Sequence, residues 1–463
     1  MRLSSPRRSD HPAVVPADPP RTGSGGGPVL RTLVAGAALF CLLQIAPIGP
    51  QLVAPTIGLA LAVGCLLLVA TRSRRRHDAR VGLWVVVLGL VCGVAMAVAQ
   101  SLFVTSGSPA TIALSVVLVL AAAVAVGAGG RRADLAFAVV LAAYALLAVG
   151  DLALVETRID VRPLLEGGLD ATLSGSSPYG ITVPNPFTAA ESAQYLGPGT
   201  VVDGRIVFGY PYLPAPLLLD LPAHLLGDAR WMHLASILGA GVLAWRTATD
   251  RIGRAASVLL VVNPLTTTVL IAYWIEPVMV MFLALAAWGM VRGNRATGVA
   301  LGLFFASKQY AVSYVPTLWT VVRSSGWRTV WTAALVGGVV VGAFVVWDPR
   351  AFVHSVIDFH LVQPFRRDSV SLLPGLDTLV GPLPAWMLSA APLLGFVVSA
   401  LVAVRTRPGP TAMSLGVGLS LLVTVLFSKQ GHTNYYFLIG AALLLAVVTW
   451  PHDDPVPGTA EDA

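Results

Sequence analysis

The chain has 463 residues, of which 56% are hydrophobic and only 11% are charged, and its net charge is +7. It holds many apolar runs of about 17 to 22 residues, each long enough to cross a bilayer as a helix. This composition indicates an all-α polytopic membrane protein. It does not indicate nucleic-acid binding, because the arginines are divided among short loops and form no continuous basic face. All three cysteines (Cys41, Cys65 and Cys92) lie inside apolar runs, which argues against a disulfide framework.

The predicted elements begin with a tail, residues 1–28, rich in Ser, Pro, Gly and Arg, for which we expect a disordered cytoplasmic segment. We expect transmembrane helices over 29–155, 230–347 and 385–450, and a second cytoplasmic tail over 451–463. The apolar runs predict about 13 to 14 crossings, with the short pair around Lys308 giving the weakest signal. These runs lie at 30–46, 52–71, 82–104, 109–126, 133–155, 230–247, 255–272, 276–292, 296–306, 309–323, 327–347, 385–404, 411–428 and 433–450.

The orientation is predicted by the positive charges, because cytoplasmic loops retain Lys and Arg. Placing the N-terminus inside puts 21 of the 30 basic residues in the cytoplasm, including the run 72–76. The net positive charge is therefore interpreted as a signal of topology.

On this topology two long loops, 156–229 and 348–384, face out of the cytoplasm. The first holds eight of the chain's 23 Asp and Glu residues, and it is expected to be solvated because carboxylates are costly near hydrocarbon. Its apolar stretch 212–226 is short and interrupted by prolines, which predicts an interfacial helix along the outer leaflet. A membrane-spanning hairpin is the alternative.

Asp160 follows the fifth apolar run at the water boundary and is the first candidate for chemistry. A carboxylate in this position can act as a general base and take a proton from a sugar hydroxyl. The competing interpretation is an ordinary solvated loop acid. Asp170, Glu166 and Glu156 are weaker candidates for the same role.

The chain has only two lysines, and each stands in the tripeptide Ser-Lys-Gln, Lys308 before Gln309 and Lys429 before Gln430. Both lie at the outer end of an apolar run, where a lysine can simply extend to the headgroups. The chain otherwise uses arginine for its inner charges, and His432 stands close to Lys429. Anion binding is therefore the alternative interpretation.

Two adjacent arginines, Arg366 and Arg367, lie in the second outer loop, and paired arginines can hold phosphate through forked donors. Glu276 lies in a tight outer turn after two aromatic residues, Tyr273 and Trp274, where it can also simply cap the next helix.

Three residues of the second outer loop, His354, Asp358 and His360, have no second ligand group at a convincing metal spacing. We therefore predict no metal site there and interpret them as residues of a loop or helix surface.

The outer face thus offers one candidate general base and several candidate phosphate-binding residues. This combination suits a transfer from a lipid phosphate. Nucleotide sugars are cytoplasmic, so a glycosyltransferase that works outside must take its sugar from a polyprenyl phosphate whose tail stays in the bilayer.

At these motifs the chain resembles the GT-C class of integral-membrane glycosyltransferases, especially the bacterial polyprenyl-phosphate-mannose-dependent mannosyltransferases. The matching elements are Asp160 with Gly175-Ser-Ser-Pro-Tyr179, Tyr210-Pro-Tyr-Leu-Pro214, Asn263-Pro264 through Glu276, Lys308-Gln309-Tyr310, Pro364-Phe-Arg366 and Ser428 through His432. Two departures are visible. More spans precede the first loop than in many relatives, and the insert Ile181 to Val207 is long.

The resemblance implies a GT-C-like bundle with a large extracytoplasmic first catalytic loop, and an inverting single displacement. Asp160 would deprotonate the acceptor hydroxyl. The departing lipid phosphate would be stabilised by Lys308, Arg366, Arg367 and His432. Further substrate contacts are expected from Tyr179, Tyr210, Glu276, Gln309 and Lys429.

The implied partners are a polyprenyl-phosphate sugar donor, mannose by resemblance, a lipid-linked or cell-envelope glycan acceptor, and the lipid of the plasma membrane. A divalent cation assists some GT-C branches and not others, and the sequence shows no clear ligand set for one. A multi-span secondary transporter or a lipid-carrier flippase is the alternative. Transporters commonly show repeated halves and midplane charges, and neither pattern is visible in this sequence.

Overall fold

The computed structural model describes residues 28–43, 53–71 and 79–450. The predictions for the two tails and for the arginine run 72–76 lie outside these residues. The described chain is almost entirely helical, with one small sheet of two-residue strands.

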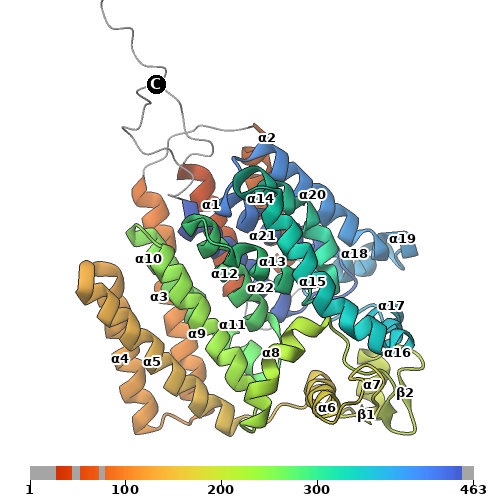
Figure 1. Ribbon diagram of the computed structural model, residues 1–463. Helices are drawn as coiled ribbons and strands as arrows, with labels where there is room; N and C mark the ends of the chain where they lie inside the picture. The colour runs from red at the N-terminus through yellow and green to blue at the C-terminus, as the bar shows by residue number, and fades with distance from the viewer. Residues whose placement is uncertain (1–27, 44–52, 72–78, 451–463) are drawn as a thin grey trace, which may run out of the picture.

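The first group of helices follows the apolar runs that precede the first long loop. It consists of α1 (Pro28–Leu42), α2 (Val53–Thr71), α3 (Ala79–Val104), α4 (Pro109–Gly127) and α5 (Gly130–Leu154). Ser108 caps α4, because its hydroxyl accepts a hydrogen bond of 3.2 Å from the N–H of Thr111, and Pro109 fixes the first turn. The helices α4 and α5 pack against each other as an antiparallel pair (Figure 1).

The central group contains one interrupted helix. Its elements are α9 (Arg230–Thr247), α10 (Arg251–Val261), α11 (Pro264–Ile271), α12 (Glu276–Arg292), α13 (Ala296–Phe305), the 3-10 helix η1 (Gln309–Thr317), α14 (Leu318–Ser325) and α15 (Trp327–Trp347). The predicted span 255–272 divides into α10 and α11 at Asn263. Its side chain caps α11 by accepting from the N–H of Thr266 at 3.1 Å. Pro264 follows and has no N–H to continue the helix.

The C-terminal group supplies the centre of the bundle. It consists of α19 (Ala385–Ser389), α20 (Ala391–Arg405), α21 (Pro410–Leu426) and α22 (Thr433–Thr449). Every residue of α21 is buried, and α22 packs against α1, α10, α12 and α21. The peripheral helices α3, α4, α5 and α15 instead expose Trp84, Leu120, Leu146 and Val339. An apolar periphery of this kind suits contact with lipid tails.

Helices form in each predicted apolar run as far as the described residues extend, and positions 44–46 and 52 of the first two runs lie outside them. Within the described residues, five segments are long and apolar enough to cross a membrane by length and composition. They are Gly82–Val104, Pro109–Gly127, Gly130–Leu154, Arg251–Ile271 and Trp327–Trp347. Further apolar helices of 10–17 residues include Ala296–Phe305, Ala391–Arg405, Pro410–Leu426 and Thr433–Thr449.

A second layer of short elements covers one end of the bundle. It contains α6 (Val161–Leu173), β1 (Val183–Pro184), α7 (Ala189–Tyr195), β2 (Val201–Val202), β3 (Arg205–Ile206), α8 (Pro214–Leu225), α16 (Pro349–Val353), the π-helix η2 (His354–Asp358), α17 (Phe359–Val362) and α18 (Leu372–Val380). Strand β3 lies between β1 and β2 and is antiparallel to both, with Val183 and Val201 opposite Ile206. Most of this layer lies at the lower right of Figure 1, away from the end where α1 begins.

The stretch predicted as either an interfacial helix or a hairpin forms the single helix α8. Twelve residues make a helix about 18 Å long, which is too short for a hydrocarbon core of about 30 Å. The helix buries Ala215 and Leu217 and packs against α6 and α9. The hairpin is therefore not formed.

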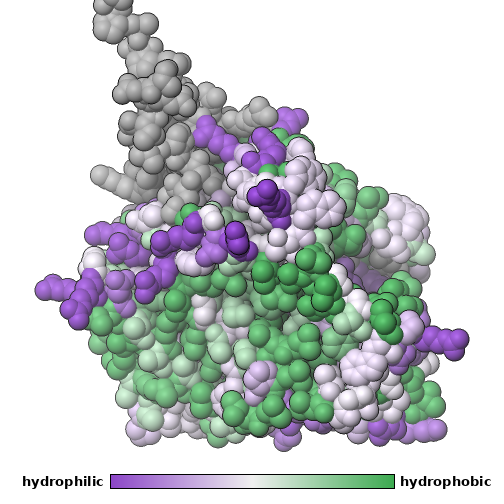
Figure 2. Space-filling model, viewed as in Figure 1, coloured by the Kyte–Doolittle hydropathy of each residue, from purple (hydrophilic) through white to green (hydrophobic). Residues whose placement is uncertain are grey.

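Hydrophilic residues gather in a band across the upper part of the surface, and the surface below the band is largely apolar (Figure 2). The band follows the helix ends on the side where α1 begins, and the layer of short elements lies at the other end (Figures 1 and 2).

Candidate active site at the covered end of the bundle

A cavity of about 320 Å³ lies where the layer of short elements meets the bundle. It brings together three residues predicted for the site, Asp160, Arg366 and His432, from three separate loops. The rest of its lining is Thr157, Arg158, Ile159, Val161, Phe187, Tyr195, Tyr212, Trp274, Phe359, His360, Gln363, Gln430, Asn434 and Tyr435. The lining therefore combines polar and aromatic side chains.

Asp160 immediately precedes α6 and is partly exposed to the cavity. Desolvation raises the pKa of its carboxyl above the ordinary value of 3.8. The backbone N–H groups of Asp160 and Val161 and the charge of Arg366 oppose this rise. A carboxylate with a raised pKa holds a proton more readily, which is the property that a general base requires.

Arg366 is fixed by three contacts that leave part of its guanidinium free. Its Nε and Nη2 donate to the two carboxylate oxygens of Asp368 at 2.7 and 2.5 Å. Its guanidinium lies over the ring of Tyr195, 4.3 Å from the centroid, and its backbone N–H donates to the carbonyl of Lys429. Among the described residues, no hydrogen-bond acceptor contacts Nη1. This nitrogen can donate a hydrogen bond to an anion in the cavity.

His432 contributes a neutral imidazole to the cavity. The pKa of its ring is lowered to about 4, chiefly by burial; the charges of Arg366 and Lys308 also lower it, while Asp368 opposes them. At neutral pH the ring is uncharged, so it can donate one hydrogen bond and accept another. Stabilisation of a phosphate by His432 would therefore come from a hydrogen bond and not from a positive charge.

Lys308 lies behind the cavity wall in a buried ion pair with Glu276. Its Nζ donates to Oε1 of Glu276 at 2.5 Å, and both side chains are almost fully buried. Asn434, which lines the cavity, donates to the same oxygen at 2.8 Å. The other carboxylate oxygen, Oε2, has no hydrogen-bond partner among the described residues. Two residues predicted for the site, Lys308 and Glu276, thus pair with each other, and Asn434 connects the pair to the cavity.

Three tyrosine rings surround the Lys308 ammonium. Its Nζ lies 4.5 Å from the ring centroid of Tyr212, 5.2 Å from that of Tyr435 and 5.5 Å from that of Tyr310. Each ring face attracts a desolvated cation. Tyr212 and Tyr435 also line the cavity, so the ion pair helps to fix the aromatic wall.

The two tyrosine motifs of the first loop lie side by side. The N–H of Tyr210 donates to the carbonyl of Pro178, and the hydroxyl of Tyr179 donates to the carbonyl of Tyr212 at 3.1 Å. A Cβ on Gly209 would meet the carbonyl oxygen of Tyr179 at 2.4 Å, so only glycine permits this approach. Tyr179 and Tyr210 are fully buried and support the wall without lining the cavity.

Gln309 and Lys429 hold backbone segments together. Gln309 donates to the carbonyls of Pro211 and Val356 at 2.7 and 2.9 Å. Lys429 donates to the carbonyls of Leu361 and Gln363 at 3.2 and 2.7 Å. Gln309 therefore ties the first outer loop to the second, and Lys429 ties the second to the segment before α22. Neither side chain lines the cavity.

Several other predicted residues lie outside the cavity lining. Arg367 is 82% exposed and pairs with Asp377 at 3.2 Å. The rival acids have other partners, since Asp170 contacts His224, and Glu166 and Glu156 both pair with Arg162.

His354 and Asp358 are 3.7 Å apart and half-exposed, whereas His360 faces the cavity. Among the described residues, no group of three or more His, Cys, Asp or Glu could hold a metal ion.

The insert between Ile181 and Val207 supplies residues that the sequence did not indicate as part of the site. It forms the three-stranded sheet and α7, and it places Phe187 and Tyr195 in the cavity wall. A capping box of Thr188 and Glu191 begins α7. The spacing Thr-x-x-Glu predicts such a helix start. Nothing in the local sequence indicates that α7 reaches Arg366.

No family model matches the chain, and no curated protein matches it. Among solved structures, the chain is similar to the crystal structure of ArnT from Cupriavidus metallidurans bound to undecaprenyl phosphate, with a TM-score of 0.43 and 14% sequence identity. The match covers 68% of this chain and spans 60% of the ArnT chain. At this level the likeness concerns the helical fold alone.

Proposed function

We propose that the protein is an inverting glycosyltransferase that moves a sugar from a polyprenyl-phosphate donor to a glycan or glycolipid acceptor. One observation carries this conclusion. A single cavity combines the carboxylate of Asp160, whose pKa is raised, the neutral ring of His432, and Arg366, whose Nη1 has no acceptor among the described residues. A base beside an anion-binding group is what displacement of a phosphate by a hydroxyl requires.

Each residue then has a defined part in one displacement. Asp160 takes the proton of the acceptor hydroxyl, whose oxygen forms a bond to the anomeric carbon of the sugar. The bond from that carbon to the phosphate oxygen breaks, and the polyprenyl phosphate leaves with the electron pair. Arg366 and His432 donate hydrogen bonds to the phosphate oxygens as their charge grows. Attack on the face opposite the leaving group inverts the anomeric centre.

A lipid-linked donor fits the predicted topology. The arginine distribution supports an orientation with the covered end of the bundle outside the cytoplasm, where a nucleotide sugar is absent. The cavity lies at the end of the apolar bundle, so a lipid tail in the bilayer can bring its phosphate to Arg366. Mannose as the sugar, and a cell-envelope glycan as the acceptor, follow from the motif resemblance.

The donor class is tested with the full-length protein in phospholipid vesicles. Polyprenyl-phosphate mannose should label added glycolipid acceptor, and a nucleotide sugar without polyprenyl lipid should not. Uptake of free sugar into the same vesicles is measured in parallel. Labelling from the nucleotide sugar alone contradicts the proposed donor, and uptake without any transfer supports a transporter instead.

Replacing Arg366 by Ala should weaken donor use strongly. A phosphate that loses a charge-assisted hydrogen bond forfeits about 1.5–3 kcal/mol, so kcat/KM for the donor should fall about 10- to 150-fold. Arg367→Ala is the matched control, because this exposed neighbour pairs with Asp377 outside the cavity, and it should stay within about twofold of wild type. Donor and acceptor kinetics are measured separately. Equal losses for both variants would contradict a specific role of Arg366.

A further inference from the structure

A second cavity, of about 450 Å³, lies between α5, α9 and α10. It is lined by the N-terminal half of α5, whereas Asp160 follows the C-terminal end of that helix. Its volume is within the range of small-molecule sites, about 300–1,000 Å³. On α5 its lining follows positions 130, 133, 134, 137, 138 and 141, which form one stripe along a helix. From this cavity we infer a site for the phosphodiester headgroup of an anionic phospholipid, separate from the candidate active site.

The charge of this cavity suits a single phosphodiester. Arg246 and Arg254 line it together with Asp134, which leaves one net positive charge. Arg246 is exposed, and it pairs with no carboxylate among the described residues. Arg254 donates one N–H to the carbonyl of Ala128 at 2.7 Å, and among the described residues it forms no ion pair within 4 Å. A singly charged phosphodiester would neutralise the excess.

The nearby carboxylates are already engaged. Asp134 accepts a hydrogen bond from the indole N–H of Trp245 at 2.8 Å. Asp250, whose pKa is lowered by Arg31 and by Arg254, accepts from two nitrogens of Arg31 at 2.6 and 3.1 Å. Neither acid forms an ion pair with Arg246 or Arg254 within 4 Å. Both guanidinium groups therefore remain open to an external anion.

An aromatic stack makes one wall of the cavity rigid. The rings of Phe137 and Trp245 are nearly parallel, at 4°, with centroids 4.3 Å apart. The guanidinium of Arg254 lies 6.0 Å from the Trp245 ring. The stack holds the Trp245 N–H toward Asp134 and gives Arg254 a fixed position, so less conformational entropy is lost when an anion binds.

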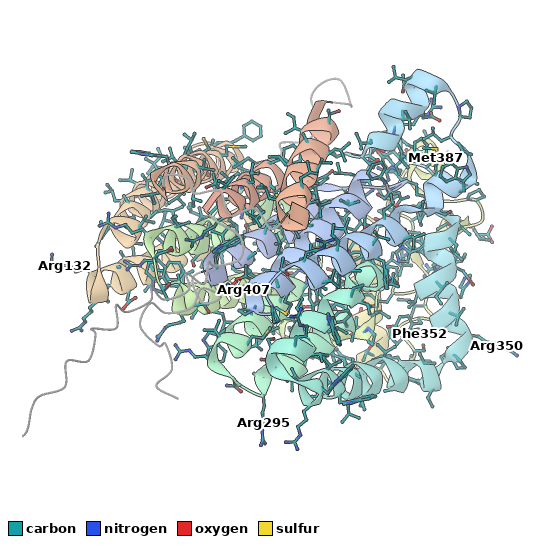
Figure 3. All side chains as sticks on the ribbon, turned by 90° about the horizontal axis from the view of Figure 1, so that it is seen from above. Arg132, Arg295, Arg350, Phe352, Met387 and Arg407 are labelled. Atoms are coloured by element: carbon teal, nitrogen blue, oxygen red, sulfur yellow. The ribbon has the colours of Figure 1, made fainter. Side chains whose placement is uncertain are left out.

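The surroundings indicate that the anion belongs to a lipid and is not a free ion. Val242, in the cavity wall, is 40% exposed, and the outer face of α5 exposes Leu135, Val139 and Leu146. These residues would contact acyl chains below a bound headgroup. Basic pockets between helices on the cytoplasmic side are sites of this kind. Arg132, in the first turn of α5, is two positions from Gly130 of the cavity lining and lies at the edge of the molecule (Figure 3).

The test counts lipids bound to the purified full-length protein by native mass spectrometry, with phosphatidylglycerol and phosphatidylcholine as probes. Wild type should retain one phosphatidylglycerol in preference to phosphatidylcholine, and Arg246→Ala should weaken that binding about tenfold. Arg295→Ala is the matched control, because Arg295 is exposed, lies outside the cavity and points away from the helices (Figure 3). The control should bind as wild type does.

Three outcomes would overturn this inference. They are equal retention of both lipids, equal loss for Arg246→Ala and Arg295→Ala, and full displacement of the lipid by equimolar glycerol phosphate, which would identify a soluble anion as the ligand. Thermal unfolding without added lipid checks that Arg246→Ala is folded. Sugar transfer is not needed for this measurement, so failure of the proposed function would leave the result unaffected.

Discussion

Asp160→Asn should abolish sugar transfer while the protein stays folded and binds its donor lipid. The amide has nearly the shape of the carboxylate but cannot accept the proton of the acceptor hydroxyl. A positioned general base typically contributes about 10²- to 10⁴-fold to the rate, so kcat should fall by at least that factor. Donor binding should change little, because Arg366 and His432 remain in the cavity. Initial rates and donor-lipid binding are measured on the same preparation.

The pH profile of the wild-type enzyme provides a second check on Asp160. The base works only when it is deprotonated, so activity is lost as the pH falls through its pKa. Burial raises that pKa above 3.8, and the acid limb should therefore lie above the range of an ordinary aspartate. Asp170→Asn is the control, since Asp170 is exposed and contacts His224 outside the cavity. Near-normal activity of Asp160→Asn together with loss of activity in Asp170→Asn would show that Asp160 is not the general base.

The helices could be predicted because their signal is local. An apolar run long enough to cross a bilayer has few alternatives to a helix, and the described part of each predicted run is helical. Asn263 and Pro264 were visible as a motif, yet their effect on the predicted span 255–272 became clear only from the structure. A cap hydrogen bond and a missing N–H divide that span in two.

The site was only partly predictable because partners far apart in sequence decide the role of each polar residue. Glu276 and Lys308 were both predicted to face the outside, but their separation of 32 positions carries no sign that they pair. The motifs that contain Gln309 and Lys429 led us to expect contacts with the substrate. In the fold both side chains instead donate hydrogen bonds to backbone carbonyls. Asp160 could be proposed from the sequence because it follows an apolar run at the water boundary and precedes the motif Gly175–Tyr179.

Removal of one partner of the buried ion pair should strongly destabilise the protein. In Lys308→Ala the carboxylate of Glu276 loses its ammonium partner and keeps only Asn434. Breaking a buried pair in this way typically costs about 3–5 kcal/mol. Glu276→Ala should cost a similar amount, because it leaves Lys308 charged among three tyrosine rings. Unfolding of the purified variants in detergent, followed by tryptophan fluorescence, measures the loss.

The double variant Glu276→Gln with Lys308→Met decides what the pair does for catalysis. Replacing a buried ion pair by neutral groups of similar volume is often neutral for stability. The carbonyl oxygen of the introduced amide can still accept from Asn434, so we expect the double variant to regain most of the lost stability. If Lys308 acts by fixing Tyr212 and Tyr435 in the cavity wall, donor affinity should recover together with stability. If the double variant is as stable as wild type but does not bind the donor, then Lys308 contacts the phosphate directly and must leave Glu276 to do so.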